Sequence, residues 1–374
     1  MIKFWSYERE FKKYQKLIIK NVEKTLKKGN IFFGNEINSF EKEFIKKYKS
    51  KYGIAVGSGT DALLISLMSI KIKSGDEVIT ASNTAIPTIS AIVNSGARPV
   101  LIDIKEDYLI DADKIEKKIT KKTKAIIPVH LYGKSCDMDK IIKISNKYKL
   151  SIIEDCAQSQ GAKFNNKFLG TFGSLGCFSF YPTKILGGYG DGGFILTNNF
   201  RLYSAIKKIR FYGIDTVDKK NKFYNKYYSN INGLNSRLDE VNSKILNFKL
   251  NKIDQFIAKR RKIAKIYDNE LKNTELKLPI INIKKFDVYH LYTVFHKKRD
   301  VIIKKLLKEK IQTRIIYPFP IHKMKAYLNF FKNEKYIVSE MMAKGIFSLP
   351  LYPELSIKDV KFICKKLKKI LLSI

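Results

Sequence analysis

Cysteine and histidine are scarce in this chain of 374 residues. The four cysteines, Cys136, Cys156, Cys177 and Cys364, form no CxxC pair, which argues against a disulfide framework and a zinc site. The four histidines form no HExxH pattern, so that metal-binding motif is missing as well. The sequence therefore predicts reduced thiols and no metal site.

Long apolar runs are also missing. The opening segment MIKFWSYEREFKKYQKL mixes acidic and basic residues with its apolar ones, unlike a secretory signal. No run approaches the length of about 20 residues that spans a bilayer. Because 45% of the residues are hydrophobic, the chain can still bury a large core. We expect a cytoplasmic protein with two domains, or with one large α/β unit and an appendage.

Acidic residues are few: 35 stand against 72 Lys and Arg, a formal net charge of +37. Such an excess raises the possibility of nucleic-acid binding. The lysines, however, recur from end to end, as in KKYKSKY and KKITKKTK, and no helix-turn-helix, zinc-finger or RNP motif is found. This dispersal favours solvated helix faces, and the positive field would help to attract an anionic small molecule.

Short apolar runs alternate with amphipathic stretches between about residues 50 and 200, which is typical of β-α units around a mostly parallel sheet. From 238 to 273 the apolar residues follow helical spacing and predict one long helix. The remainder, from about 275 to 374, is expected to form a smaller α+β domain. Ligands of such sheets bind at the carboxyl ends of the strands.

Three groups of residues follow predicted strands. Gly57-Ser58-Gly59-Thr60 precedes a helix, where free N–H groups would bind an anion such as phosphate, although Gly and Ser also serve tight turns for shape alone. Glu154-Asp155 follows a buried run, where an acid would either cap the next helix or hold a cation.

The third group surrounds Lys184, the one Lys or Arg between residues 168 and 200. Poor hydration among aromatic and glycine residues favours the neutral amine, a nucleophile for carbonyl groups. A lysine whose ammonium reaches water is the alternative. Together, a phosphate cradle, a cation-binding acid and a Schiff-base lysine match the three chemical handles of pyridoxal phosphate (PLP).

The chain resembles the PLP-dependent sugar aminotransferases of the DegT/DnrJ/EryC1/StrS family. The resemblance covers nearly the whole chain and is carried by a series of motifs in family order: GSGTDALL, PVHLYG, IIEDCAQSQGA, GTFGSLGCFSFYPTKILGGYGDGG, NSRLDE and YPFPIH. It implies the α/β fold of PLP-dependent transferases of fold type I (aspartate aminotransferase-like), with a large PLP-binding domain at 1–250 and a small C-terminal domain at 251–374. Family members work as homodimers.

The resemblance also implies roles for individual residues. Lys184 would form the Schiff base with PLP, Asp155 would bind the pyridinium nitrogen, and Gln158 would lie near the phenolic oxygen. The remaining assignments are phosphate contacts from Gly59, Thr60 and Ser179, a phosphate contact from the partner subunit's Asn235, and sugar contacts from Tyr181 and His322.

Within the family, NTAIPTISAI, YYSNINGLNSRLDEV and VYHLYTVFHKKRD look most like enzymes that aminate C3 of dTDP-3-keto-6-deoxyhexoses. The implied amino donor is L-glutamate, and the implied role is synthesis of surface polysaccharide, such as O-antigen, or of another glycan. A C4-specific aminotransferase and a nucleic-acid-binding protein on the same fold are the alternatives. In sugar 3-dehydratases that resemble this group a histidine replaces the lysine, so Lys184 favours amino transfer.

Three positions depart from the family pattern. Ala85 stands where many relatives have an aromatic residue that stacks on the cofactor, Gln160 where histidine is frequent, and Tyr189 where a smaller or aliphatic residue is usual. These departures concern the substrate pocket more than the cofactor site.

Overall fold

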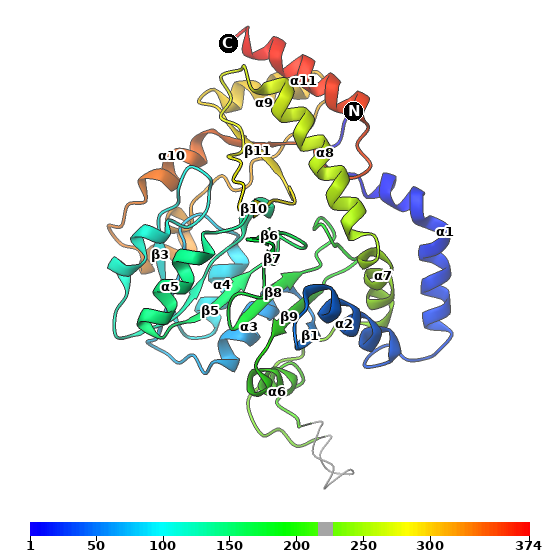
Figure 1. Ribbon diagram of the computed structural model, residues 1–374, viewed down its shortest axis with the longest axis vertical. Helices are drawn as coiled ribbons and strands as arrows, with labels where there is room; N and C mark the ends of the chain where they lie inside the picture. Colours follow the sequence, from blue (N-terminus) through cyan, green and yellow to red (C-terminus); the bar gives the residue numbers. More distant parts are fainter. Residues whose placement is uncertain (216–226) are drawn as a thin grey trace.

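A seven-stranded sheet forms the centre of the computed structural model, which describes residues 1–215 and 227–374 (Figure 1). The strand order is β1-β9-β8-β5-β4-β2-β3, and β9 alone runs against the other strands. The predicted mostly parallel sheet is therefore confirmed. Its strands are β1 (Tyr52–Val56), β2 (Glu77–Ala81), β3 (Arg98–Ile102), β4 (Thr123–Ile127), β5 (Ser151–Asp155), β8 (Leu175–Ser179) and β9 (Gly193–Thr197).

Helices pack against this sheet because its strands are apolar on both faces. Every residue of β8 and β9 is buried, as expected for strands covered on both sides. Helix α3 packs on β8 and β9 and lies beside α4 and α6, while α2 packs on β1 and on α7. The helices of this unit are α2 (Asn35–Tyr48), α3 (Gly59–Ser69), α4 (Ile86–Asn94), α5 (Met138–Tyr148), α6 (Phe200–Ile209) and α7 (Glu240–Leu250).

The expected long helix from 238 to 273 is wrong, because the structure has two helices there. Helix α7 ends at Leu250, and α8 (Ile253–Leu271) begins after Lys252, whose φ of −113° and ψ of 0° depart from helical values. The break lets α7 pack against α1 (Tyr7–Leu26) and α2, while α8 packs against α11 (Ile357–Leu371) in another part of the molecule. Hydrophobic spacing continues through both helices and gives no sign of the change in partners.

The C-terminal part contains a two-stranded sheet of β11 (Tyr292–Phe295) and β12 (Ile346–Leu349), with α9 (Arg299–Lys308), α10 (Ile337–Gly345) and α11 around it. Helix α8 contributes Ile253 and Ile257 to the main apolar core and Ile263 and Tyr267 to a second core cluster. The domain boundary after residue 250 stays a prediction. A three-stranded sheet joins β6 (Lys163–Phe164), β7 (Lys167–Phe168) and β10 (Lys285–Phe286).

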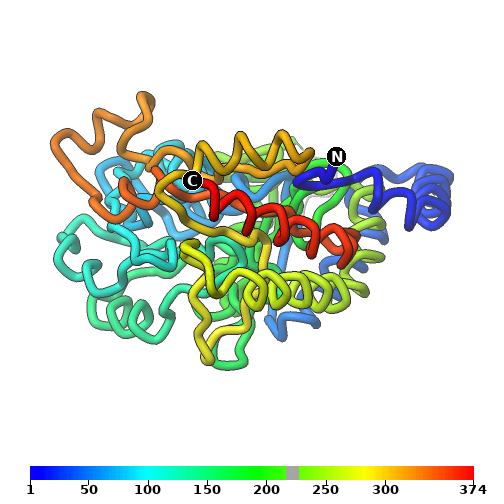
Figure 2. Tube along the Cα trace, turned by 90° about the horizontal axis from the view of Figure 1, so that it is seen from above, coloured from blue at the N-terminus to red at the C-terminus, as the bar shows by residue number. Residues whose placement is uncertain are grey.

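Both chain ends lie at the same end of the molecule (Figures 1 and 2). The N–H of Ile2 donates to the carbonyl of Lys310 at 2.8 Å, and the N–H of Gln312 donates back to Ile2 at 3.0 Å. The first residues are therefore joined to the C-terminal part before α1 crosses to α7.

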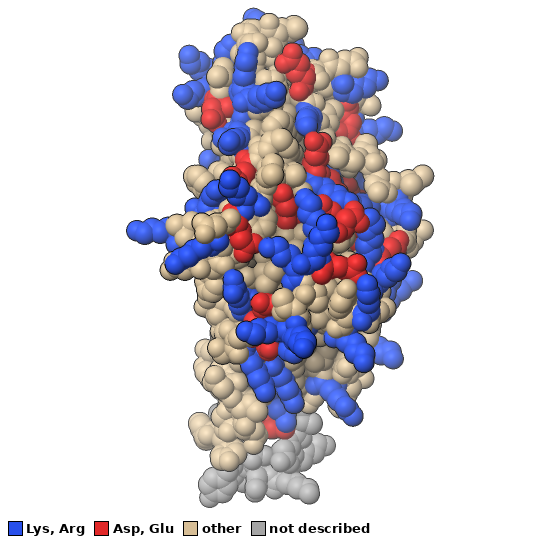
Figure 3. Space-filling view, turned by 90° about the vertical axis from the view of Figure 1, so that its left-hand side faces the viewer, with Lys and Arg blue, Asp and Glu red and all other residues tan. Residues whose placement is uncertain are grey.

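Basic side chains are spread over the molecule, with acidic side chains among them, on the face that Figure 3 shows. Many form exposed ion pairs, such as Lys27 with Glu23 and Lys147 with Glu116. No helix in the described part of the chain is both long and apolar enough to cross a bilayer.

Candidate active site

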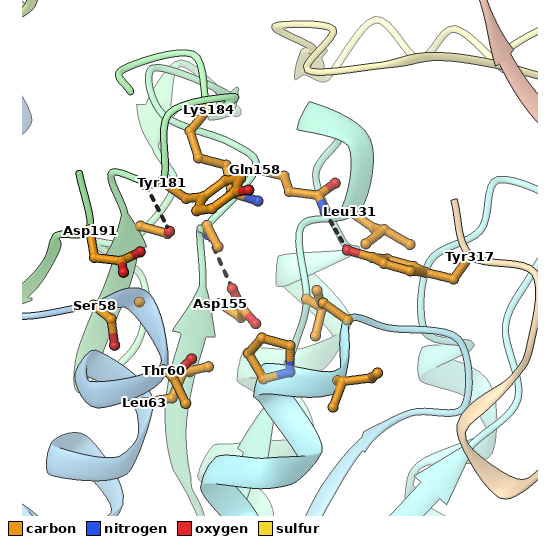
Figure 4. A pocket seen from close by; sticks show the side chains of 17 residues that line it. Ser58, Thr60, Leu63, Leu131, Asp155, Gln158, Tyr181, Lys184, Asp191 and Tyr317 are labelled. Carbon is orange, nitrogen blue, oxygen red and sulfur yellow. Dashed lines mark hydrogen bonds between the residues drawn. The ribbon is translucent and has the colours of Figure 1, made fainter. Parts of the chain in front are cut away.

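A cavity of about 310 Å³ opens at the carboxyl ends of β5 and β8 (Figure 4). This is the edge of the sheet where the sequence placed ligand binding. Six predicted cofactor residues and the predicted sugar contact Tyr181 line this cavity; the six are Gly59, Thr60, Asp155, Gln158, Ser179 and Lys184. The structure thus brings residues from distant parts of the chain into one site.

The start of α3 forms one side of this cavity. The Ser58 hydroxyl accepts from the Asp61 N–H at 3.0 Å and caps the helix, whose first N–H groups have no carbonyl in a preceding turn. A Cβ on Gly59 would lie 2.6 Å from the Ser179 Cβ, so only glycine permits this approach between α3 and β8. The helix start, Ser179 and Thr60 together form a cradle that suits a phosphate group.

Asp155 lies at the floor of the cavity, where 4% of its surface is exposed. Its carboxylate accepts from the Thr88 hydroxyl at 2.8 Å and from the Ala157 N–H at 3.1 Å. Burial raises the pKa of Asp155, against the opposing effects of these two donors and of Lys184. A buried carboxylate of this kind gains most from a ligand that presents a positive N–H group.

Lys184 lies across the cavity from the floor, in a compact turn. The backbone N–H of Lys184 donates to the Tyr181 carbonyl at 2.8 Å. A Cβ on Gly187 would lie 2.2 Å from the Pro182 carbonyl oxygen, so the turn needs glycine there. Within the described part of the chain Lys184 forms no salt bridge. Burial lowers the pKa of Lys184 to about 8, which favours a nucleophilic amine near neutral pH.

Glu154 has a different position from Asp155, because neighbouring residues of a strand point to opposite faces. Glu154 is fully buried and accepts from the N–H groups of Gly170, Phe172 and Gly173 at 2.7–2.8 Å. His130 Nε2 lies 3.2 Å from the same carboxylate. Glu154 therefore fixes the loop before β8, while Asp155 faces the cavity.

Two predicted contacts lie outside the cavity of their own chain. Asn235 forms a β-bridge with Phe211, and the next residue, Ser236, donates to Asp61 at 2.7 Å. His322 is buried, with Nε2 2.9 Å from Glu340 Oε1. Neither lines the cavity, so their functional roles stay predictions.

The structure shows the surroundings of the three positions that depart from the family pattern. The cavity wall at Ala85 continues through Ile86 and Pro87 and carries no aromatic ring. Gln160 Nε2 donates to the Ser179 carbonyl at 2.6 Å. The ring of Tyr189 packs against Phe11 of α1 at a centroid distance of 6.3 Å, which accounts for the large residue in the glycine-rich turn.

Sequence reasoning assigned no role to Tyr317, which also lines the cavity and accepts a hydrogen bond from Gln158 Nε2 at 3.1 Å. Tyr317 is the first residue of YPFPIH, one of the motifs that carry the family resemblance. Nothing in that motif shows that the loop reaches a site built by strands more than a hundred residues earlier.

Comparison with known proteins finds relatives that match nearly the whole chain. The model of the DegT/DnrJ/EryC1/StrS aminotransferase family matches residues 12–368. The dTDP-3-amino-3,6-dideoxy-alpha-D-galactopyranose transaminase of Aneurinibacillus thermoaerophilus is 40% identical over 96% of this chain and 97% of its own length. The dTDP-3-amino-3,4,6-trideoxy-alpha-D-glucose transaminase of Micromonospora megalomicea subsp. nigra is 38% identical over 94% of each chain.

Solved structures agree with this placement. A DegT DnrJ EryC1 StrS aminotransferase from Brucella abortus is 30% identical, with a TM-score of 0.93 over 99% of this chain and 100% of that one. The ntda protein of Bacillus subtilis, solved with bound cofactor PMP, is 29% identical, with a TM-score of 0.88 over 99% of this chain and 83% of that one.

The Gly59→Ala substitution is expected to weaken PLP binding about 5- to 150-fold, because relieving a 2.6 Å contact shifts the cradle at a cost of about 1–3 kcal/mol. The dissociation constant of PLP, measured by absorbance titration of cofactor-free protein, checks this. Gly190→Ala is the matched control, since its Cβ would meet nothing closer than 4.0 Å. Equal affinities of the two variants would contradict the cradle.

Glu154→Gln is expected to lower the free energy of unfolding by about 1.5–3 kcal/mol, because the amide cannot accept from all of the loop N–H groups. Urea denaturation measures the loss. The exposed Glu116→Gln, which removes a surface pair with Lys147, should cost less than about 1 kcal/mol. A loss at Glu154 no larger than at Glu116 would show that the loop does not depend on the carboxylate.

Proposed function

The chain belongs to the DegT/DnrJ/EryC1/StrS aminotransferase family, and on this premise we propose that it transfers an amino group from L-glutamate to a dTDP-3-keto-6-deoxyhexose. The product would be a dTDP-3-amino-3,6-dideoxyhexose for a surface polysaccharide such as O-antigen, or for another glycan. The protein is a PLP-dependent sugar aminotransferase. The proposal concerns its donor, its acceptor sugar and its biological role.

A single cavity joins a nucleophilic lysine, a buried acid and the open start of a helix, and this observation supports PLP-dependent amino transfer. Lys184, Asp155 and the cradle at Gly59 fit the three reactive parts of PLP, namely its carbonyl, its ring nitrogen and its phosphate. Within the described residues Asp155 forms no salt bridge, and the first N–H groups of α3 point out of the helix, so the positive ring nitrogen and the phosphate of PLP would each be stabilised there.

When bound, PLP supplies the electron sink that stabilises negative charge on the α-carbon of the amino donor. The residues of the chain do the rest. Asp155 holds the proton on the ring nitrogen, since a neighbouring carboxylate favours the protonated form. The Lys184 amine would take the proton from the donor α-carbon and would deliver it to the cofactor carbon that had carried the carbonyl group, a role that its lowered pKa supports.

The acceptor sugar is proposed from two relatives. Those at 40% and 38% identity are both named as transaminases of dTDP-3-amino sugars. Tyr181, half of whose surface is exposed at the cavity, is the proposed sugar contact, with His322 as a second. A C4-specific sugar aminotransferase of the same family is the alternative.

We further propose a homodimer with shared active sites. Asn235 does not line the cavity of its own chain, and the surface near it exposes several large apolar side chains: Ile31, Phe32, Phe33, Tyr212 and Ile231. A second copy would cover these side chains. The partner subunit's Asn235 would then reach the phosphate.

A cytoplasmic location is proposed because all four cysteines are free and buried. Nucleic acid is not a proposed partner, because the visible basic side chains are interspersed with acidic ones (Figure 3).

Asp155→Asn is expected to keep the fold and to lower kcat at least about a hundredfold, a loss of about 3 kcal/mol, because a neutral amide does not hold the proton on the ring nitrogen. Steady-state kinetics with the keto sugar measure the loss, and circular dichroism checks the fold. Turnover near that of the wild type would remove Asp155 from this role.

L-glutamate added to the PLP-loaded protein is expected to replace the absorbance band of the lysine-bound cofactor with that of pyridoxamine phosphate, because the first half-reaction needs no sugar. Lys184→Ala should show no such change within the same time. If the wild-type spectrum stays constant with L-glutamate but changes with another amino acid, the proposed donor is wrong.

A further inference from the structure

Two hydrogen bonds fix the orientation of the Gln158 amide. Its Oε1 accepts from the backbone N–H of Tyr132 at 2.8 Å, and its Nε2 lies 3.1 Å from the Tyr317 hydroxyl oxygen. A backbone N–H can only donate, so the amide oxygen must face Tyr132 and the NH₂ group must face Tyr317. The Tyr317 oxygen is therefore the acceptor in this pair.

The hydroxyl hydrogen of Tyr317 is left available to another group. Within the described residues, Gln158 is the one hydrogen-bond partner of this hydroxyl. Burial raises the pKa of Tyr317 to about 12, with Asp155 adding to the effect, so the phenol keeps its proton at neutral pH. Because Tyr317 lines the cavity, this hydrogen can be donated to an acceptor on a ligand.

The loop that carries Tyr317 is also held in place. The Tyr132 hydroxyl donates to the carbonyl of Ile316 at 2.5 Å, so Tyr132 binds this loop through its side chain and Gln158 through its backbone. Tyr317 reaches the cavity from a different part of the chain. Its position relative to Gln158 is nevertheless fixed by Tyr132, which binds both.

Figure 4 shows which part of a ligand would face this hydroxyl. Ser58 and Thr60 lie on one side of the cavity, Tyr317 lies on the opposite side, and Asp155 and Lys184 lie between them. In PLP the phosphate arm and the phenolic oxygen flank the carbonyl-bearing carbon on opposite sides. With the phosphate at the start of α3 and the carbonyl at Lys184, the phenolic oxygen faces Tyr317.

We propose that Tyr317 is a catalytic residue that donates a hydrogen bond to the ionised phenolic oxygen of bound PLP, and that Gln158 positions its hydroxyl. The inference deepens the proposed function and rests on the PLP-binding part of it. It adds Tyr317 to the expectation that Gln158 lies near this oxygen, because the amide oxygen of Gln158 is bound by Tyr132 and the NH₂ group supports Tyr317.

Tyr317→Phe tests the proposal because it removes only the hydroxyl and keeps the ring in place. The absorbance of the PLP-loaded protein, titrated with pH in the absence of substrates, reports protonation of the bound cofactor. Loss of a donor to an ionised oxygen is worth about 1.5–3 kcal/mol and should raise the titration midpoint by about 1–2 pH units. The dissociation constant of PLP should rise about tenfold or more.

Tyr203→Phe is the matched control, since this partly buried tyrosine packs on Tyr52 away from the cavity. Its midpoint should equal that of the wild type, and thermal denaturation should show both variants folded. An unchanged midpoint in folded, PLP-loaded Tyr317→Phe would overturn the proposal. If the KM for the keto sugar rises instead, the hydroxyl serves a sugar oxygen and not PLP.

Gln158→Met tests the positioning role. It should raise the midpoint in the same direction, and the double variant with Tyr317→Phe should shift no further than the larger single variant, because both act through one hydroxyl. Additive shifts would mean that Gln158 contacts the oxygen by itself. Failure of the wild type to take up PLP would instead refute the cofactor assignment, so the two failures are distinguishable.

Discussion

The separation of two charged groups, Asp155 and Lys184, is the constraint on which the site depends. Asp155 is buried and Lys184 is half-buried, and the two form no salt bridge with each other. A direct ion pair would satisfy both and leave no binding energy for a ligand. The sheet prevents this pair by holding Asp155 on its strand with Thr88 and Ala157, while a glycine-dependent turn holds Lys184 across the cavity.

The same constraint explains why the surrounding residues pack so closely. The start of α3 must touch the end of β8 for the cradle to lie beside the two charges, and Gly59 makes that contact possible. Glu154 points to the face of β5 opposite Asp155, where its carboxylate holds the loop that leads into β8. One short strand therefore carries a ligand-facing acid and a structural acid side by side in sequence.

Most of the cofactor site could be predicted because the carboxyl ends of parallel strands lie at the same edge of the sheet. Thr60, Asp155 and Ser179 lie at or just after the carboxyl ends of β1, β5 and β8, and the sheet topology brings these ends together. Tyr317 could not be placed in this way, since its loop enters from the C-terminal part of the chain. The break at Lys252 was hidden for a related reason: helical spacing records burial, whereas the direction of a helix depends on which partner buries it. Asn235 and His322 were predicted by family resemblance, and neither lines the cavity of its own chain.

The pairing of Ile2 with the segment around Ile311 has a consequence for how the chain folds during synthesis. Ile2 cannot complete these bonds until residue 312 has emerged from the ribosome, roughly 15–60 s after Ile2 at typical elongation rates. The seven-stranded sheet can form within that interval, once Thr197 at the end of β9 has emerged, but Ile2 still lacks its final partner. This pairing is therefore a late event that joins two segments made far apart in time.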